Sequence, residues 1–178
     1  MMGVSVSHVT VYNWIGKYVE LMNLTIYYEM HGVSGRYFIE SLRQVKNVFG
    51  YERLQLFPIN SLADVTPSPY SVSPRVFLIH GVLRTSFSCD VFLNGFAYEK
   101  NNIATVQYQR TMVGTIFLIV HELAHLRGLS HCKSKNCVMG VERKDATTSY
   151  AWMNLVGAHR KVSTRLFCKH CRSALRAC

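Results

Sequence analysis

The sequence predicts a single α/β domain in which helices pack on a twisted, mixed β-sheet. Strand-like segments precede and follow a segment with helical periodicity, and a longer helical segment comes after the last strand. The 178 residues, 49% of them hydrophobic, are enough for one full core and too few for two ordinary domains. We therefore expect one domain over residues 1–178, with an N-terminal lobe at about 1–128 and a C-terminal lobe at about 129–178.

The first half of the chain alternates between strand and helix patterns. Residues 4–12 alternate apolar and polar side chains, as a strand does, and residues 18–28 do so less regularly. In residues 34–48, apolar side chains recur at helical spacing until a glycine at position 50, which predicts a helix. Residues 53–59 form a strand candidate, and residues 61–74 a loop rich in serine and proline.

The second half contains more strands and a long helix. The short apolar run at residues 75–80 suits a buried strand, and residues 90–98 and 102–109 are two strand candidates separated by an EKNN turn. The long helix should begin after Thr111, a suitable N-cap, and end near Leu126. Its apolar residues supply a buried face, whereas its C-terminal end carries histidines.

The strongest motif is HELAHLRGLSHC, at residues 121–132. His121 and His125 are four apart, so they project from the same face of a helix and could bind one metal ion, while Glu122 could hydrogen-bond a water there. Gly128 can end the helix in a left-handed conformation, and the turn brings His131 round as a third ligand. Three histidines with one open position are typical of a catalytic zinc, whereas a structural zinc has four protein ligands.

Four cysteines form two pairs at zinc-ligand spacing. Cys132 and Cys137 make a C-x4-C pair, and Cys168 and Cys171 make a C-x2-C pair. Together they predict a tetrahedral structural zinc site that fixes the C-terminal segment to the end of the long helix. The alternatives are free buried thiols with a chance C-x2-C, or a site in which His170 replaces one cysteine.

The composition bounds the partners and the compartment. A net charge of +10 favours acidic partners, and nucleic acid has to be considered. The basic residues are dense only at residues 160–176, however, so a solvated basic surface is the preferred explanation. The N-terminus lacks the pattern of a signal peptide, and the longest apolar stretch is far shorter than the roughly 20 residues of a membrane span. We expect a cytoplasmic, monomeric protein with no membrane association, in which cysteines bind metal.

The HELAHLRGLSHC segment, the following Cys137 and Met139 and the final C-x2-C pair closely resemble the archaemetzincins. The resemblance implies a metzincin-type α/β fold with a zinc-pinned C-terminal segment and two zinc ions, one catalytic and one structural. It implies the following roles: catalytic-zinc ligands His121, His125 and His131, general base Glu122, structural-zinc ligands Cys132, Cys137, Cys168 and Cys171, and Met139 in the Met-turn, where a lone Met would otherwise be ordinary core. The 28 residues between Met139 and Cys168 exceed the usual family spacing, which an inserted helix at about 149–160 would explain.

The expected function is that of a zinc metallopeptidase with an aminopeptidase-like activity on peptides or proteins. By resemblance, residues 92–97 form an edge strand that pairs with an extended substrate, which makes Phe92, Asn94, Gly95 and Phe96 candidate substrate-binding residues. The alternative is a catalytically weak, zinc-stabilised module that binds acidic partners or nucleic acid. A thiol redox protein using the C-x2-C pair is a third reading. Glu122 favours the enzyme, because a purely structural site does not need that carboxylate.

Overall fold

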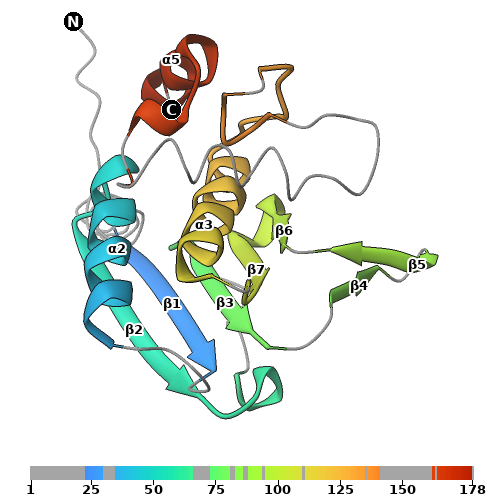
Figure 1. Ribbon diagram of the computed structural model, residues 1–178. Coiled ribbons are helices and arrows are strands. Elements are labelled where there is room, and N and C mark those ends of the chain that lie inside the picture. The colour runs from blue at the N-terminus through green and yellow to red at the C-terminus, as the bar shows by residue number, and fades with distance from the viewer. Residues whose placement is uncertain are drawn as a thin grey trace, which may run out of the picture.

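The computed structural model describes residues 23–29, 35–65, 73–80, 83–85, 88–93, 95–109, 111–134, 136–140, 162 and 164–177. In chain order, the elements are β1 (Asn23–Glu29), α2 (Gly35–Val48), β2 (Arg53–Ile59), η1 (Leu62–Asp64), β3 (Arg75–Ile79), β4 (Leu83–Thr85), β5 (Ser88–Leu93), β6 (Gly95–Tyr98), η2 (Glu99–Asn101), β7 (Ile103–Gln107), α3 (Met112–Leu126), η3 (Thr164–Leu166) and α5 (Lys169–Ala177). Figure 1 shows their arrangement.

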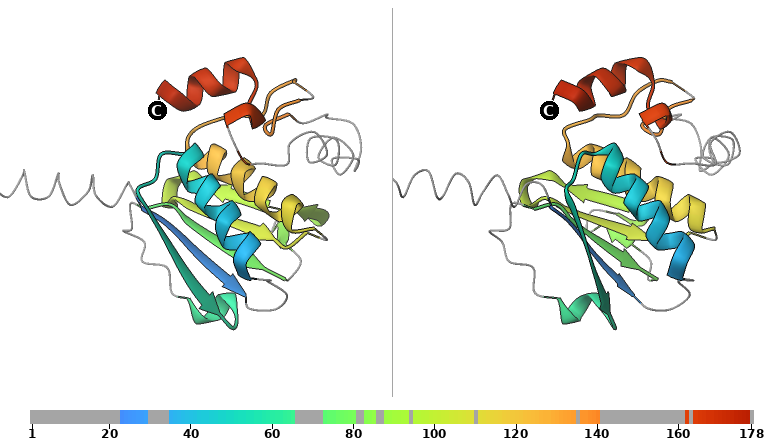
Figure 2. Two further views of the ribbon diagram at one scale, coloured as in Figure 1. Left: turned by 60° about the vertical axis from the view of Figure 1, so that its left-hand side comes forward. Right: turned by 90° about the vertical axis from the view of Figure 1, so that its left-hand side faces the viewer.

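A five-stranded mixed sheet is the centre of the fold, in the order β2-β1-β3-β7-β6. Its first four strands are parallel, and β6 pairs antiparallel with β7 at the edge. The helices α2 and α3 lie side by side on one face of this sheet (Figure 2). This architecture confirms the predicted α/β class and mixed sheet.

The helices form where the sequence predicted them. Phe38, Leu42 and Val45 of α2 are buried, but Ile39, which the pattern also assigned to the apolar stripe, is 36% exposed. Thr111 caps α3, because its side-chain oxygen accepts a hydrogen bond from the backbone N–H of Gly114 at 3.1 Å. Buried residues occupy every position of α3 from 115 to 124, since the helix packs against the sheet and also against α2 beside it.

One strand prediction is wrong. Residues 90–98 were expected to form one strand, but β5 pairs antiparallel with β4 in a separate two-stranded sheet, and β6 belongs to the main sheet. Apolar residues continue from one strand into the next with only Asn94 and Gly95 separating them, so the pattern could not show where the pairing partner changes. The strand expected at 18–28 begins at Asn23 within the described residues. The strand expected at 4–12 and the helix expected at 149–160 lie outside the described residues.

The C-terminal segment joins the same core as the sheet and helices. Leu166, Phe167 and Cys171 are buried in one hydrophobic cluster with residues of α2 and α3. The ring of Phe167 meets that of Phe49, at the end of α2, edge-on at 6.2 Å. The helix α5 follows this buried segment and lies beyond the C-terminal end of α3 (Figure 1). The sequence pattern did not predict α5. In the part of the chain that the structure describes, no helix is long and apolar enough to cross a membrane.

Candidate metal centres

The end of α3 is a tight turn that positions two of the histidines. The N–H of Gly128 donates to the carbonyl of His125 at 2.8 Å, and the N–H of Leu129 donates to that of Ala124 at 3.0 Å. These are the two hydrogen bonds of a Schellman motif, and Gly128 has the left-handed φ of 76° that the motif requires. The turn reverses the chain and places His131 opposite the helix.

The three histidines converge on one point. Their Nε2 atoms are 3.2 Å apart for His125 and His121, 3.0 Å for His125 and His131, and 3.1 Å for His131 and His121. In a tetrahedral site with Zn–N distances of about 2.0–2.1 Å, the nitrogens lie about 3.3–3.4 Å from one another. The observed triangle is therefore close to the size that one zinc ion needs.

Hydrogen bonding fixes which ring nitrogens could bind that ion. The Nδ1–H of His121 donates to the carbonyl of Val138 at 2.7 Å, and the Nδ1–H of His125 donates to that of Leu129 at 2.8 Å. Burial lowers the pKa of His121 to about 4 and that of His125 below its usual value, so both rings are neutral at pH 7. Their Nε2 atoms then carry lone pairs that face each other, an arrangement that repels unless a cation lies between them.

Glu122 follows His121 on α3 and is a buried carboxyl group, with 5% of its surface exposed. Burial raises its pKa to about 8, whereas a nearby metal cation would favour the carboxylate. A buried carboxyl with a perturbed pKa is typical of a proton-transferring group. The structure thus brings the three predicted histidines together and buries Glu122 on the same helix as two of them.

The four cysteines form a second cluster, whose Sγ atoms all lie within 4.8 Å of one another. Two of them, Cys137 and Cys171, are buried, and all four are free thiols. The N–H of Cys168 donates to the Sγ of Cys137 at 3.3 Å, which links the two pairs directly. A tetrahedral zinc with Zn–S distances of about 2.3 Å places its sulfurs roughly 3.8 Å apart, so this set fits one ion.

The charge of the thiols also fits a metal. Burial, the dominant cause, raises the pKa of Cys137 to about 11 and that of Cys171 well above its usual range, and neighbouring thiols contribute in the same direction. Burial opposes ionisation of Cys168 too, but hydrogen bonds from Cys171 and other neighbours lower its pKa. Several thiolates this close to one another are unfavourable without a cation, whereas zinc binding deprotonates all of them.

The two clusters are connected through one short loop. Val138 lies between Cys137 and Met139, and its carbonyl orients His121 while its N–H donates to the carbonyl of Leu166 at 2.8 Å. The Met139 carbonyl accepts the N–H of Cys132 at 2.8 Å, and the Met139 side chain is fully buried, which suits a Met-turn and an ordinary core residue alike. The pattern predicted the side chains of both clusters but not the Val138 carbonyl, because any residue can provide a backbone oxygen.

The predicted substrate-binding residues lie on two different strands. Phe92 is on β5, in the two-stranded sheet, and Asn94 lies outside the described residues. Gly95 and Phe96 are on β6, the edge strand next to α3. Phe96 is 50% exposed and stacks on Tyr98, with 6.5 Å between the ring centres.

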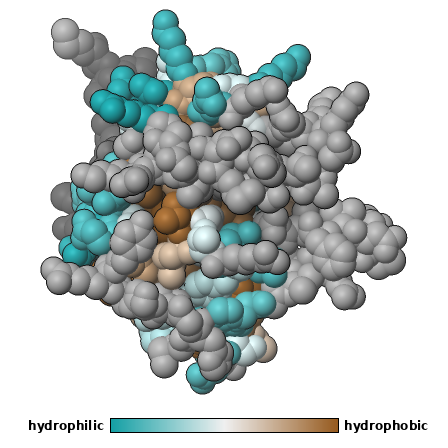
Figure 3. Space-filling model, in the orientation of Figure 1, coloured by the Kyte–Doolittle hydropathy of each residue, from teal (hydrophilic) through white to brown (hydrophobic). Residues whose placement is uncertain are grey.

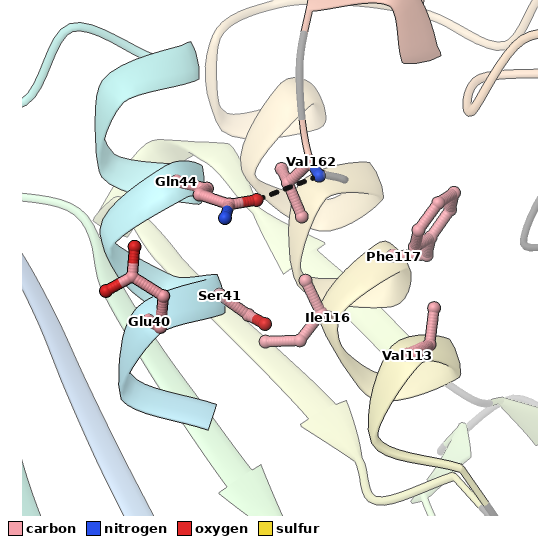
Figure 4. A pocket seen from close by; sticks show the side chains of 7 residues that line it. All are labelled: Glu40, Ser41, Gln44, Val113, Ile116, Phe117 and Val162. Atoms are coloured by element: carbon pink, nitrogen blue, oxygen red, sulfur yellow. Dashed lines mark hydrogen bonds between the residues drawn. The ribbon is translucent and has the colours of Figure 1, made fainter. Parts of the chain in front are cut away.

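A small hollow between α2 and α3 is separate from both clusters. It has a volume of about 50 Å³ and is lined by Glu40, Ser41, Gln44, Val113, Ile116, Phe117 and Val162 (Figure 4). The N–H of Val162 donates to the Gln44 side-chain oxygen at 3.1 Å across it. This space suits one or two water molecules and is far too small for a peptide.

Solved structures share this fold. The crystal structure of archaemetzincin from Methanopyrus kandleri matches with a TM-score of 0.61 and 16% identity, over 89% of this chain and 95% of that one. A zinc-dependent peptidase from Methanocorpusculum labreanum matches with a TM-score of 0.54 and 17% identity, over 85% of this chain and 99% of that one. No model of a known protein family and no curated protein matches the sequence. The chain therefore has the fold of the archaemetzincins, as its motifs predict.

Proposed function

We propose that the protein is a zinc-dependent metallopeptidase that binds two zinc ions, one at the histidine cluster and one at the cysteine cluster. The observation that carries the proposal is the convergence of three Nε2 atoms at the end of the helix that also carries the buried Glu122. Three neutral imidazoles leave one coordination position open for a water or substrate oxygen. Four cysteines leave no such position, so the chemistry belongs to the histidines and the cysteines stabilise the fold.

The histidines, the backbone carbonyls that orient them and Glu122 have different roles in the proposed hydrolysis. A zinc ion held there would supply Lewis-acid chemistry and lower the pKa of a bound water to about 7. The Val138 and Leu129 carbonyls keep His121 and His125 in the tautomer that binds metal. Glu122 takes the proton from the attacking water and transfers it to the amine nitrogen of the leaving group.

The substrate we propose is an extended peptide that pairs with β6. This strand is the last in the described sheet and packs against α3, so a peptide added to it would lie next to the histidines. We further propose aminopeptidase-like cleavage. In support, the negative charge of the exposed Glu99, which follows β6, favours the protonated form of His125. The Glu99 carboxylate therefore lies near the histidine cluster. A carboxylate there could bind the free α-amino group of a substrate.

The decisive test replaces Glu122 by the isosteric Gln. We expect Glu122→Gln to retain both zinc ions and the fold but to lose at least about a hundredfold in kcat, because the variant cannot accept a proton. Zinc content, thermal unfolding and hydrolysis of fluorogenic peptides and aminoacyl substrates would be measured together. The control is Glu52→Gln, which removes an exposed carboxylate ahead of β2 and should behave as the natural chain does.

A second candidate function has one observation in its favour. Lys169, Arg172 and Arg176 lie on one face of α5, and the sequence has no acidic residue after Asp145. Several hydrophilic residues lie at the top of the molecule in Figure 3, where α5 lies, with apolar residues between them. A zinc-stabilised module that binds acidic partners would show two zinc ions and no hydrolysis by the natural chain. Unchanged activity in Glu122→Gln would also refute the enzymatic proposal.

A further inference from the structure

Gly95, the first residue of β6, lies directly against the Glu122 side chain. A Cβ atom placed on Gly95 would be 2.5 Å from the Oε1 of Glu122 and 2.9 Å from its Cδ and Cγ. Such distances are far below van der Waals contact, so the carboxylate occupies the space that any other side chain at position 95 would need. The helix α3 and the edge strand thus meet at this point through a carboxylate on one side and bare backbone on the other.

The backbone conformation does not explain the glycine. Among the described glycines, Gly50 and Gly128 have the positive φ angles that disfavour other residues, whereas Gly95 does not. It pairs in regular register with Val106 of β7, as any strand residue could. Space for the Glu122 side chain is therefore the constraint at this position.

We propose that Gly95 is a positioning residue, which holds the Glu122 carboxylate between the histidine cluster and the edge strand. The inference rests on the proposed peptidase function. Glu122 is nearly fully buried, so its carboxylate has few alternative positions once the backbone of β6 closes one side. The same backbone would bind the substrate, so the glycine would bring the general base close to the scissile peptide bond.

The identity of the atoms that would overlap in Gly95→Ala predicts whether the variant loses mainly activity or mainly stability. The nearest obstacle to a methyl group is the end of a side chain rather than another backbone, so the chain can relieve the overlap by moving the Glu122 carboxylate. The loss should fall mainly on catalysis and less on folding. We expect kcat to fall about a hundredfold with KM changed less than threefold and both zinc ions retained.

A double-mutant cycle tests this without relying on activity alone. Gly95→Ala should lower the Tm by about 2–4 °C in the chain with Glu122, and not in the Glu122→Ala chain, where the space is free. In the Glu122→Gln chain, Gly95→Ala should change the residual kcat less than twofold, because the carboxylate is already lost. The control is Ala97→Gly, which alters one methyl group on the same face of β6 and should show no coupling with position 122.

The outcomes separate the two proposals. An active natural chain with kcat unchanged in Gly95→Ala would overturn the positioning role, as would a raised KM at constant kcat, which would mean that Gly95 contacts substrate instead. An inactive natural chain that still shows the Tm coupling would refute the peptidase proposal while leaving the steric relation intact. If the Gly95→Ala variant folds only when Glu122→Ala is also present, the steric relation is supported. If neither the Gly95→Ala variant nor the double variant folds, the steric relation is refuted.

Discussion

The two candidate metal centres are adjacent but are built in opposite ways. All three histidines fall within 11 residues, on the last turns of one helix and the loop that follows it. The cysteines come in two pairs with 30 residues between Cys137 and Cys168. The first cluster is preformed by local geometry, whereas the second exists only when distant segments have met. A local cluster can serve chemistry at little cost to folding, while a long-range cluster contributes stability that rises slowly with the length of chain it closes.

The largest effect should follow from breaking the long-range cluster. Cys137→Ser removes one of the four thiols of the proposed zinc site, and the remaining three cannot complete the coordination of the ion. We therefore expect a loss on the order of 5 kcal/mol in the free energy of unfolding. The segment from η3 to α5 should become accessible to protease. Thermal unfolding, limited proteolysis and zinc content measure these changes.

The matched control for this variant is Cys89→Ser, because Cys89 is on β5 and is not part of either ligand-spaced pair of the sequence. It should keep two zinc ions. The histidine site should also weaken in Cys137→Ser, since the Val138 carbonyl that orients His121 is carried by the cysteine loop. A Cys137→Ser chain with natural stability and natural zinc affinity at the histidines would show that the two centres are independent.

Breaking the local cluster should leave the fold nearly intact. His125→Ala removes one ligand and the hydrogen bond to Leu129, so we expect a loss of about 1 kcal/mol in stability, one zinc ion retained and no detectable hydrolysis. Metal analysis and thermal unfolding test this. His170→Ala is the control, because His170 is exposed and belongs to neither cluster although it lies between two cysteine ligands. Loss of a zinc ion in His170→Ala would instead make it a ligand.

The same contrast explains what the sequence could predict. The histidine cluster follows from helical spacing and from Gly128, which are local properties, so the pattern predicted the convergence of all three rings. Ligand-like spacing identified the cysteine pairs, but their meeting depends on the packing of Leu166 and Phe167 into the core. The division between β5 and β6 depends on pairing partners, which apolar alternation does not encode.

Backbone groups were the least predictable part of the site. The carbonyls of Val138 and Leu129 fix the histidine tautomers, but their role is independent of side-chain type and has no sequence signature. Gly95 was predicted to lie near the substrate cleft, and the structure places the Glu122 carboxylate against it. A glycine pattern alone cannot show whether the space it creates is filled by a ligand or by another part of the chain.

The smallest expected effect concerns Glu99, at the border of the histidine cluster. If its exposed carboxylate binds the free amino group of a substrate, Glu99→Gln should raise KM about two- to fivefold for aminoacyl substrates, the size expected of an exposed ion pair, with kcat and stability unchanged. N-acetylated peptides with the same side chains should be unaffected, and Glu40→Gln, at an exposed position of α2, should alter neither class. An equal effect on free and acetylated substrates would mean that Glu99 acts through its charge on His125. The proposed aminopeptidase preference would then lose its support, while the contrast between a local catalytic site and a long-range structural one would stand.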